Sequence, residues 1–295
     1  MDLSLPRRAV LALLAACAPA WAQLDDGADE RRGAAAKLPP GARAERDIAY
    51  GPDPRQRLDV FIPAQTHRAP IVLMVHGGCW IIGDKGNAGV TQGKVARWLP
   101  RGFVVASANY RIDRARPDTL GQADDVAAAL AFVQKRAGDW GADGSRVLLM
   151  GHSAGAHLAA MVAADPVFAE RAGAKPWLGT VALDSAAYDL VELMERPHFR
   201  FYDKVFGPER RHWEANSPYH RLRGTPQPML LVCSEKRSDS CPAAQKFAAK
   251  ARAAGAQVTL LPVDLNHGQI NARLGDDSDY TRRVEDFMRS VGLKF

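Results

Sequence analysis

The sequence has few of the features that mark metal-binding or nucleotide-binding proteins. Among its 295 residues there are four cysteines, and aromatic residues make up 7%. No cysteine or histidine spacing matches a zinc site, and no glycine-rich loop matches a dinucleotide-binding or Walker pattern. We therefore expect neither a metal nor a cofactor.

A block of one charge is also missing. The formal net charge is +6, but the 39 basic residues are scattered among 33 acidic ones. No basic stripe with interleaved aromatics is present, so a nucleic-acid partner is not expected. Hydrophobic and charged contents of 47% and 24% are ordinary for a globular protein. The chain shows no repeat and no convincing second domain, and its length fits one large α/β domain.

The N-terminal hydrophobic run is too short to cross a bilayer. Arg7 and Arg8 precede ten mostly apolar residues, Ala9–Ala18, and an Ala-x-Ala pattern follows at residues 20–22. This arrangement predicts a signal peptide over residues 1–22, with a mature chain that begins at Gln23. We therefore expect a periplasmic or secreted protein without a membrane span.

The same run permits two other interpretations. Residues 14–17, Leu-Ala-Ala-Cys, resemble a bacterial lipobox, in which Cys17 would carry a lipid and anchor the protein to a membrane. The run could also be a structural helix. A lipoprotein would also be exported.

If the protein is exported, the cysteines that remain after the signal peptide can form a disulfide. Cys233 and Cys241 are close enough in sequence to close a small loop, and an oxidising compartment favours a disulfide there. Cys79 would then stay free or buried. Three reduced core cysteines remain the alternative, because spacing does not determine connectivity.

Apolar runs alternate with amphipathic ones from residue 47 onward, after a solvated tail over residues 23–46. The expected strands are mostly continuous apolar runs, which are typical of parallel strands covered on both faces. They are Leu58–Ile62, Ile71–Val75, Phe103–Ala108, Arg146–Met150, Thr180–Leu183, Met229–Cys233 and Val258–Val263.

Helical patterns between the strands complete an α/β fold. We expect helices over Gln122–Arg136, Pro242–Ala254 and Tyr280–Val291. Residues 186–222 interrupt the alternation with many aromatic and charged residues and predict a small helical insertion over the strand ends. The fold class is thus a mostly parallel sheet with helices on both faces, in one domain over residues 47–295.

The most informative motif is Gly-His-Ser-Ala-Gly at residues 151–155. It follows an expected strand and precedes a helix-like run, and this context is that of a nucleophile elbow. Ser153 is the candidate nucleophile. His152 flanks it and is expected to line the substrate site rather than to act as a base.

A serine nucleophile needs a histidine base and an orienting acid, in the chain order Ser, acid, His. His267 follows the last expected strand and fits the base. The acid should follow the penultimate strand, where Asp239 lies between the strand end and a Pro-started helix. Glu235 in the same loop and Asp184 after the preceding strand are the competitors.

The third expected element is an oxyanion hole. His-Gly-Gly-Cys-Trp at residues 76–80 follows a buried strand. Glycine lets a backbone approach the developing alkoxide closely, so the N–H groups of Gly78, Cys79 and Ala154 are the expected donors. Trp80 is expected to contact substrate.

These motifs together resemble the serine α/β-hydrolases of the carboxylesterase/lipase superfamily, near its hormone-sensitive-lipase-like and feruloyl/acetyl-esterase-like branches. The resemblance covers roughly residues 47–292. It also rests on residues 56–60, 108–111 and 188–190, on Ser217-Pro218 and on His267-Gly268. In three places the chain departs from the pattern: Cys79 replaces a third glycine, Cys233-Ser234 replaces a His-Gly pair, and the acid loop is longer by about one residue.

The resemblance implies an exported serine carboxylesterase that cleaves small or aromatic carboxylic esters through an acyl-enzyme. The expected partner is a small-molecule ester. The His-Gly-Gly-x-Trp motif also occurs in arylformamidase-like amide hydrolases, which are the first alternative. A hydrolase-like binding module without catalysis is the second.

Overall fold

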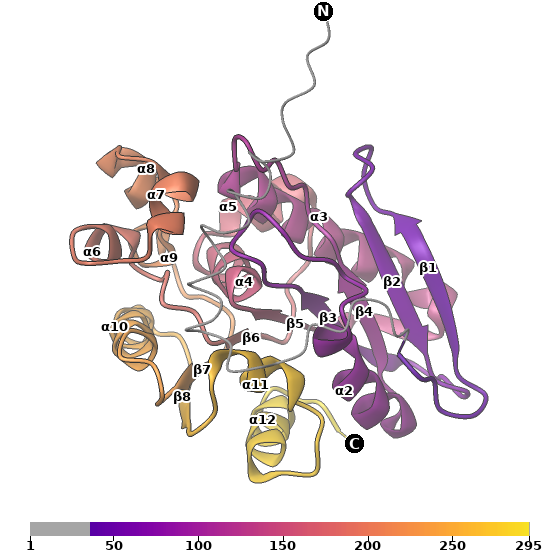
Figure 1. Cartoon of the computed structure of the whole chain (residues 1–295). Helices are drawn as coiled ribbons and strands as arrows, with labels where there is room; N and C mark the ends of the chain where they lie inside the picture. Colours follow the sequence, from indigo (N-terminus) through magenta and orange to yellow (C-terminus); the bar gives the residue numbers. More distant parts are fainter. Residues whose placement is uncertain (1–35, 295) are drawn as a thin grey trace, which may run out of the picture.

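The computed structural model describes residues 36–294, and its centre is an eight-stranded sheet (Figure 1). The strand order is β1-β2-β4-β3-β5-β6-β7-β8. β1 and β2 run antiparallel to their neighbours, and every pairing from β4 to β8 is parallel. The strands are β1 (Arg43–Ala49), β2 (Arg57–Ile62), β3 (Ala69–Val75), β4 (Val104–Ala108), β5 (Ala142–His152), β6 (Gly179–Leu183), β7 (Met229–Ser234) and β8 (Val258–Val263).

Helices cover both faces of the sheet, as the alternating pattern predicted. Apolar side chains of α3, α4, α5 and α10 join one hydrophobic core, and those of α2 and α12 join the core on the opposite face. In Figure 1, α2 and α12 accordingly lie on the other side of the sheet from α3 and α4. The longer helices are α2 (Ala88–Trp98), α3 (Thr119–Arg136), α4 (Ala154–Ala164), α10 (Ser240–Ala253) and α12 (Asp279–Ser290), and the shorter ones are α5 (Pro166–Ala172) and α11 (His267–Ala272).

The central strands are buried because they are apolar along their whole length. Every residue of β3 is buried, and so is every residue of α4, which packs between the sheet and α3. A parallel strand covered on both faces needs this continuous apolar character. The nucleophile motif lies between the buried end of β5, at His152, and the start of α4, at Ala154.

The solvated tail predicted over residues 23–46 is too long at its C-terminal end. Residues 43–46 belong to β1, and Ala36 and Leu38 pack against the core that contains α2. β1 is an edge strand that pairs with β2 alone, and most of its positions are exposed or half-buried. Its charged, non-apolar sequence suits an edge, where charge discourages pairing with another chain.

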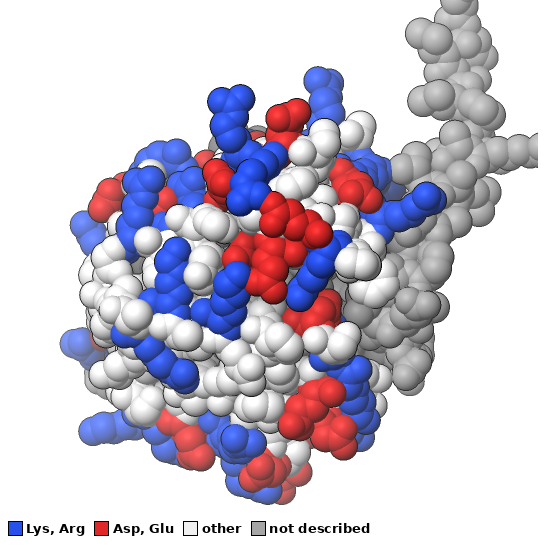
Figure 2. All heavy atoms as spheres, turned by 90° about the vertical axis from the view of Figure 1, so that its left-hand side faces the viewer, with Lys and Arg blue, Asp and Glu red and all other residues white. Residues whose placement is uncertain are grey.

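The expected insertion forms four short helices at one end of the molecule (Figure 1). They are α6 (Leu190–Met194), α7 (Arg200–Phe206), α8 (Arg210–Ala215) and α9 (Pro218–Arg221). Figure 2 shows basic and acidic side chains side by side on this end of the molecule. Lys246 of α10 bonds to both Asp189 and Glu192, and Arg210 pairs with Glu195. The surface of the insertion is thus one of mixed charge.

Cys233 and Cys241 form the predicted disulfide, with their Cα atoms 5.0 Å apart, and Cys79 is buried outside this disulfide. The disulfide joins the end of β7 to the first turn of α10. Within residues 36–294, no helix is both long and apolar enough to cross a bilayer. The predicted signal peptide and the alternative lipidation site at Cys17 lie outside the described residues.

Candidate active site

Ser153 occupies a strained turn between β5 and α4. Its φ and ψ are 57° and −118°, in a region where residues with a Cβ are rare. The turn is held because Ser153 N–H donates to the carbonyl of Leu183 on β6 at 3.0 Å, and the Ser153 carbonyl accepts from His157 in α4 at 3.1 Å. Strain of this kind costs about 1–3 kcal/mol and persists where surrounding structure enforces it. The geometry is that of the expected nucleophile elbow.

The loop after β3 packs directly on this elbow. A Cβ added to Gly77 would lie 2.9 Å from the Cβ of Ser153, so only glycine permits the approach. The loop then passes through three consecutive residues with positive φ: Gly78 (124°), Cys79 (48°) and Trp80 (64°). Such a run turns the backbone sharply over the nucleophile.

Two of the three expected oxyanion donors line the same pocket as Ser153. They are Cys79 in the loop and Ala154 at the start of α4, whereas Gly78 is not among the residues that line the pocket. The first residues of a helix present N–H groups without intrahelical partners, which suits them to a developing negative charge. The geometry is compatible with Cys79 and Ala154 as donors and gives Gly78 a role in shaping the loop.

His76 stabilises the loop after β3. Its buried ring stacks on Tyr110 with centroids 4.3 Å apart, and its Nδ1 donates to the carbonyl of Gly77 at 2.6 Å. Burial lowers the pKa of His76 to about 4, so the ring is neutral at physiological pH. Because His76 is buried and is not among the residues that line the Ser153 pocket, it orients the loop.

His267 lies where a base for Ser153 is needed. It is the first residue of α11, inside a capping box formed by Asn266 and Gln269, and its ring lines the Ser153 pocket. His267 Nδ1 donates to Asp184 Oδ2 at 2.5 Å. This bond selects the tautomer in which Nε2 is unprotonated and able to accept a proton.

The carboxylate behind His267 is Asp184, so the expectation that Asp239 holds this place is wrong. Asp239 instead receives two hydrogen bonds from Arg237, at 3.1 and 3.0 Å, and begins α10 as its N-terminal flanking residue. Glu235 is exposed, and its backbone bonds to β8. Asp184, the competitor after the neighbouring strand, reaches the histidine because its φ of 58° turns its side chain into the site.

Asp184 is fully buried and accepts four hydrogen bonds. Oδ2 receives His267 and Arg237, the latter at 2.8 Å, and Oδ1 receives Ser234 N–H at 2.8 Å and the Ser240 hydroxyl. Burial acts to raise the pKa of Asp184, but Arg237, His267 and Ser240 outweigh it and hold the pKa well below its usual range. The carboxylate is therefore ionised throughout the neutral range.

His152 does not line the substrate pocket, contrary to expectation. It lies behind His267, with ring centroids 4.5 Å apart, and its Nε2 donates to the His267 carbonyl at 2.9 Å. Burial and the neighbouring His267 keep its pKa well below the ordinary value. His152 is thus a neutral support that fixes the backbone of the candidate base.

Trp80 lines the pocket, as predicted, together with aromatic residues from α7. Its indole N–H donates to His157 Nδ1 at 3.1 Å, and His157 Nε2 donates to the Asn216 carbonyl at 2.7 Å. This chain of bonds ties the oxyanion loop to α4 and to the insertion. The pocket has a volume of about 30 Å³, and its walls are Cys79, Trp80, Ser153, Ala154, Asp184, Ser185, Ala186, Phe201, Tyr202, Arg237 and His267.

Sequence reasoning missed two residues of the site. Arg237 lines the pocket and contacts both Asp184 and His267, and Ser240 bonds to Asp184 from the first turn of α10. Arg237 lies in the loop where the acid was sought, two positions before Asp239. The sequence does show that Arg237 is a charged residue in that loop. Its charge is positive, however, and a carboxylate was expected there.

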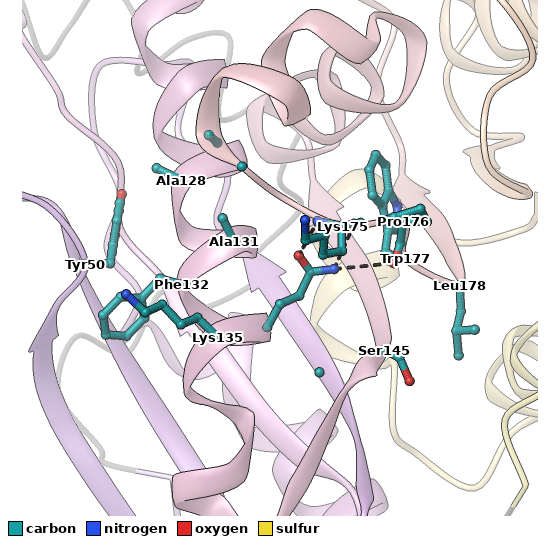
Figure 3. Close-up of a pocket in the computed structure, with 14 residues that line it drawn as sticks. Tyr50, Ala128, Ala131, Phe132, Lys135, Ser145, Lys175, Pro176, Trp177 and Leu178 are labelled. Carbon is teal, nitrogen blue, oxygen red and sulfur yellow. Dashed lines mark hydrogen bonds between the residues drawn. The ribbon is translucent and has the colours of Figure 1, made fainter.

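A larger hollow of about 1030 Å³ lies elsewhere on the surface, between α3 and the segment before β6 (Figure 3). Phe132 and Lys135 of α3 and Lys175 and Trp177 of that segment project around it. None of its described lining residues is a histidine or a carboxylate, so it lacks the groups that activate a serine. Within the described residues, no group of three or more His, Cys, Asp and Glu side chains could hold a metal ion.

Comparisons with known proteins agree with this geometry. A family model described as BD-FAE matches residues 58–172. The chain is 35% identical over 170 residues to a probable isoprenylcysteine alpha-carbonyl methylesterase (ICMEL1) of Oryza sativa subsp. japonica, covering 55% of this chain and 39% of that protein. It is 31% identical over 230 residues to the esterase LipQ of Mycobacterium tuberculosis, covering 71% of this chain and 53% of LipQ. The chain thus spans between two fifths and just over half of these relatives.

Among solved structures, esterase B from Lactobacillus rhamnosis aligns with a TM-score of 0.73 at 22% identity, covering 96% of this chain and 95% of that one. A carbohydrate esterase from gut microbiota aligns with a TM-score of 0.71 at 18% identity, covering 85% of this chain and 97% of that one. The fold is the α/β-hydrolase fold. The relatives and neighbours reported above carry the names of esterases.

Proposed function

We propose that this protein is a serine carboxylesterase in which Ser153, His267 and Asp184 form the catalytic triad. The observation that carries the proposal is that the strained Ser153, the His267–Asp184 pair and two backbone donors line one pocket. The matched relatives are named as esterases, which supports ester bonds as the target.

In the proposed reaction, Ser153 Oγ attacks the ester carbonyl carbon while His267 Nε2 accepts its proton. The N–H groups of Cys79 and Ala154 hold the oxyanion of the tetrahedral intermediate. His267 then returns the proton to the departing alcohol, leaving Ser153 acylated. A water molecule, deprotonated by His267, then attacks the acyl carbon. The bond between that carbon and Ser153 Oγ breaks, His267 returns its proton to Oγ, and the carboxylic acid is released.

Small acyl groups are the substrates that the pocket supports best. Its volume of about 30 Å³ is small beside the roughly 300–1,000 Å³ that is typical of ligand pockets. The walls from α7 are aromatic and closely packed, since the rings of Phe201 and Tyr202 lie 4.1 Å apart at their centroids. We therefore propose esters of short acids such as acetate, with the alcohol portion directed out of the pocket. An aromatic group of the substrate would belong to the alcohol portion of the ester, which is directed out of the pocket.

Labelling with a fluorophosphonate, together with p-nitrophenyl acetate turnover, tests the activity. Wild type should be labelled and active, and Ser153→Ala should lose both properties. A preference of at least about tenfold for N-formylkynurenine over p-nitrophenyl acetate, roughly 1.4 kcal/mol in transition-state stabilisation, would favour an arylformamidase instead. An unlabelled, inactive wild type would favour a binding module.

Export to the periplasm or beyond is also proposed. It rests on the signal-peptide pattern of residues 1–22 and is supported by the Cys233–Cys241 disulfide, because such bonds persist in oxidising compartments. Mass spectrometry of protein recovered from the expressing bacterium should find Gln23 at the N-terminus. A lipid on Cys17 would identify a membrane-anchored lipoprotein, and retention of residues 1–22 on cytosolic protein would contradict export.

A further inference from the structure

The guanidinium of Arg237 lies inside the candidate site between two carboxylates. Its Nη1 is 2.8 Å from Asp184 Oδ2 and 3.0 Å from His267 Nδ1. Its Nε and Nη2 donate to the two oxygens of Asp239. The side chain is 10% exposed, so solvent screens these contacts little. The site therefore holds a row of alternating charge, formed by Asp184, Arg237 and Asp239, that ends at His267.

Arg237 and His267 share one oxygen of Asp184. In the productive tautomer, Nδ1–H of His267 donates to Oδ2, and Nη1 of Arg237, which lies 3.0 Å from Nδ1, donates to the same oxygen. Arg237 can donate to Nδ1 itself only when that nitrogen is unprotonated, and Nε2 then carries the proton and cannot accept one from Ser153. The carboxylate thus has to hold both donors for His267 to be ready as a base.

A fixed positive charge beside Nδ1 opposes a second positive charge on the ring. His267 becomes an imidazolium when it takes the serine proton, and Asp184 stabilises that state. Because Arg237 forms an ion pair with the same carboxylate, Asp184 stabilises the imidazolium less strongly. Asp239 also pairs with Arg237 and offsets part of its positive charge.

His152, which is neutral, lies against the ring of His267, and Cys79 and Tyr202 line the same pocket. Lys94 bonds to the carbonyl of Asn271 in α11, and burial lowers its pKa to about 7. Among the side chains that bond directly to Asp184 or to the ring of His267, Arg237 is the permanent cation.

We propose that Arg237 is a positioning residue that shares Asp184 with His267 and thereby lowers the pH at which the enzyme loses activity. The proposal rests on the triad assigned above. Asp184 and Arg237 both stay charged over the working range, because each shifts the pKa of the other in favour of the ionised form, against the effect of burial. The charge row is therefore a permanent part of the site rather than a group that titrates with the base.

The disulfide-closed loop gives Arg237 its place. Cys233 and Cys241 are eight positions apart, and the loop between them carries Arg237 and Ser240, both bonded to Asp184. Ser234 N–H of the same loop is a third contact to the carboxylate. A neighbouring strand thus supplies the acid, and this loop supplies the groups that hold it.

The test is the dependence of kcat/KM on pH for p-nitrophenyl acetate, whose acid limb reports the base of the free enzyme. In Arg237→Met the acid limb should move to higher pH by about half a unit to one unit, since the opposing charge is gone. In Arg237→Lys, which keeps the charge, the limb should stay within about 0.3 unit of wild type. Arg97→Met is the matched control, because Arg97 forms a comparable ion pair with buried Glu285 away from the pocket. It should lose stability without moving the limb.

Asp239→Asn gives an independent arm if Arg237→Met does not fold. This variant leaves the guanidinium in place and removes its other counter-charge, so the acid limb should move to lower pH. An unchanged limb in the folded variants, or equal movement in Arg97→Met, would overturn the role of Arg237 while the triad stands. A wild type that neither turns over the ester nor reacts with a fluorophosphonate would overturn both proposals.

Discussion

Asp184 Oδ2 lies 2.5 Å from His267 Nδ1, although 83 positions separate the two residues in the sequence. The contact forms because Asp184 follows β6 and His267 follows β8, on the same edge of a parallel sheet, with β7 between them. The positive φ of Asp184 and the N–H of Ser234 direct its carboxylate across the end of β7. The loop after β7 therefore supports the acid instead of supplying it.

The Cys233–Cys241 disulfide should stabilise both the fold and the site. Closing a loop of this length restricts the unfolded chain and contributes about 2–3 kcal/mol to the free energy of unfolding. The double variant Cys233→Ser/Cys241→Ser should lose that amount in a denaturant titration, and its activity should fall because the loop holds Asp184. Dithiothreitol should affect wild type and leave the double variant unchanged. Equal sensitivity of both proteins would show that the disulfide is not the cause.

Much of the fold could be predicted from the sequence, because parallel strands covered on both faces need continuous apolar runs. β3 and β7 are such runs and were found nearly to the residue. β1 was missed because it is a charged edge strand, which has no apolar period to detect. Ser153, His267, Trp80 and the disulfide could be located from motif and order.

The acid could not be assigned in this way. Asp184 and Asp239 each follow a strand and precede helical sequence, so local pattern does not separate them. The choice is made by the φ of Asp184 and by Arg237, which binds Asp239 and faces the oxygen that His267 uses. His152 was placed wrongly for a similar reason, since the direction of a side chain beside a tight turn depends on backbone angles. These features depend on the tertiary structure, and the spacing of residues in the sequence does not reveal them.

The buried Lys94 should make stability depend on pH. It is fully buried in α2 and donates to the carbonyls of Gly89 and Asn271, the latter in the helix that begins with His267. Burial lowers its pKa from 10.5 to about 7. Between these values the unfolded chain binds a proton that the folded protein does not, so stability should rise with pH by up to about 1.4 kcal/mol per unit.

The variant Lys94→Met isolates this effect. Denaturant titrations at pH 7, 8 and 9 should show a rise for wild type that is absent in Lys94→Met, whatever its absolute stability. Lys135→Met, at an exposed position of α3, should keep the wild-type slope. Parallel slopes in all three proteins would mean that Lys94 is protonated in the folded state throughout the range.

Phe201 should limit the length of the acyl group. Replacing it with alanine removes a ring from the pocket wall, so the ratio of kcat/KM for a hexanoate ester to that for an acetate ester should rise about tenfold. Phe199→Ala is the matched control, because Phe199 stacks on Phe201 outside the pocket. An unchanged ratio in Phe201→Ala would place the acyl group elsewhere.

The identity of the acid behind His267 is tested most directly by comparing Asp184→Asn with Asp239→Asn. An amide at position 184 favours the wrong tautomer of His267 and loses the charge that stabilises the imidazolium, so kcat should fall about 10³–10⁴-fold. Asp239 reaches His267 only through Arg237, and its replacement should lower kcat less than about tenfold. The measurement is kcat for p-nitrophenyl acetate at the optimum pH of each folded variant. A larger loss in Asp239→Asn than in Asp184→Asn would contradict the triad proposed from this structure.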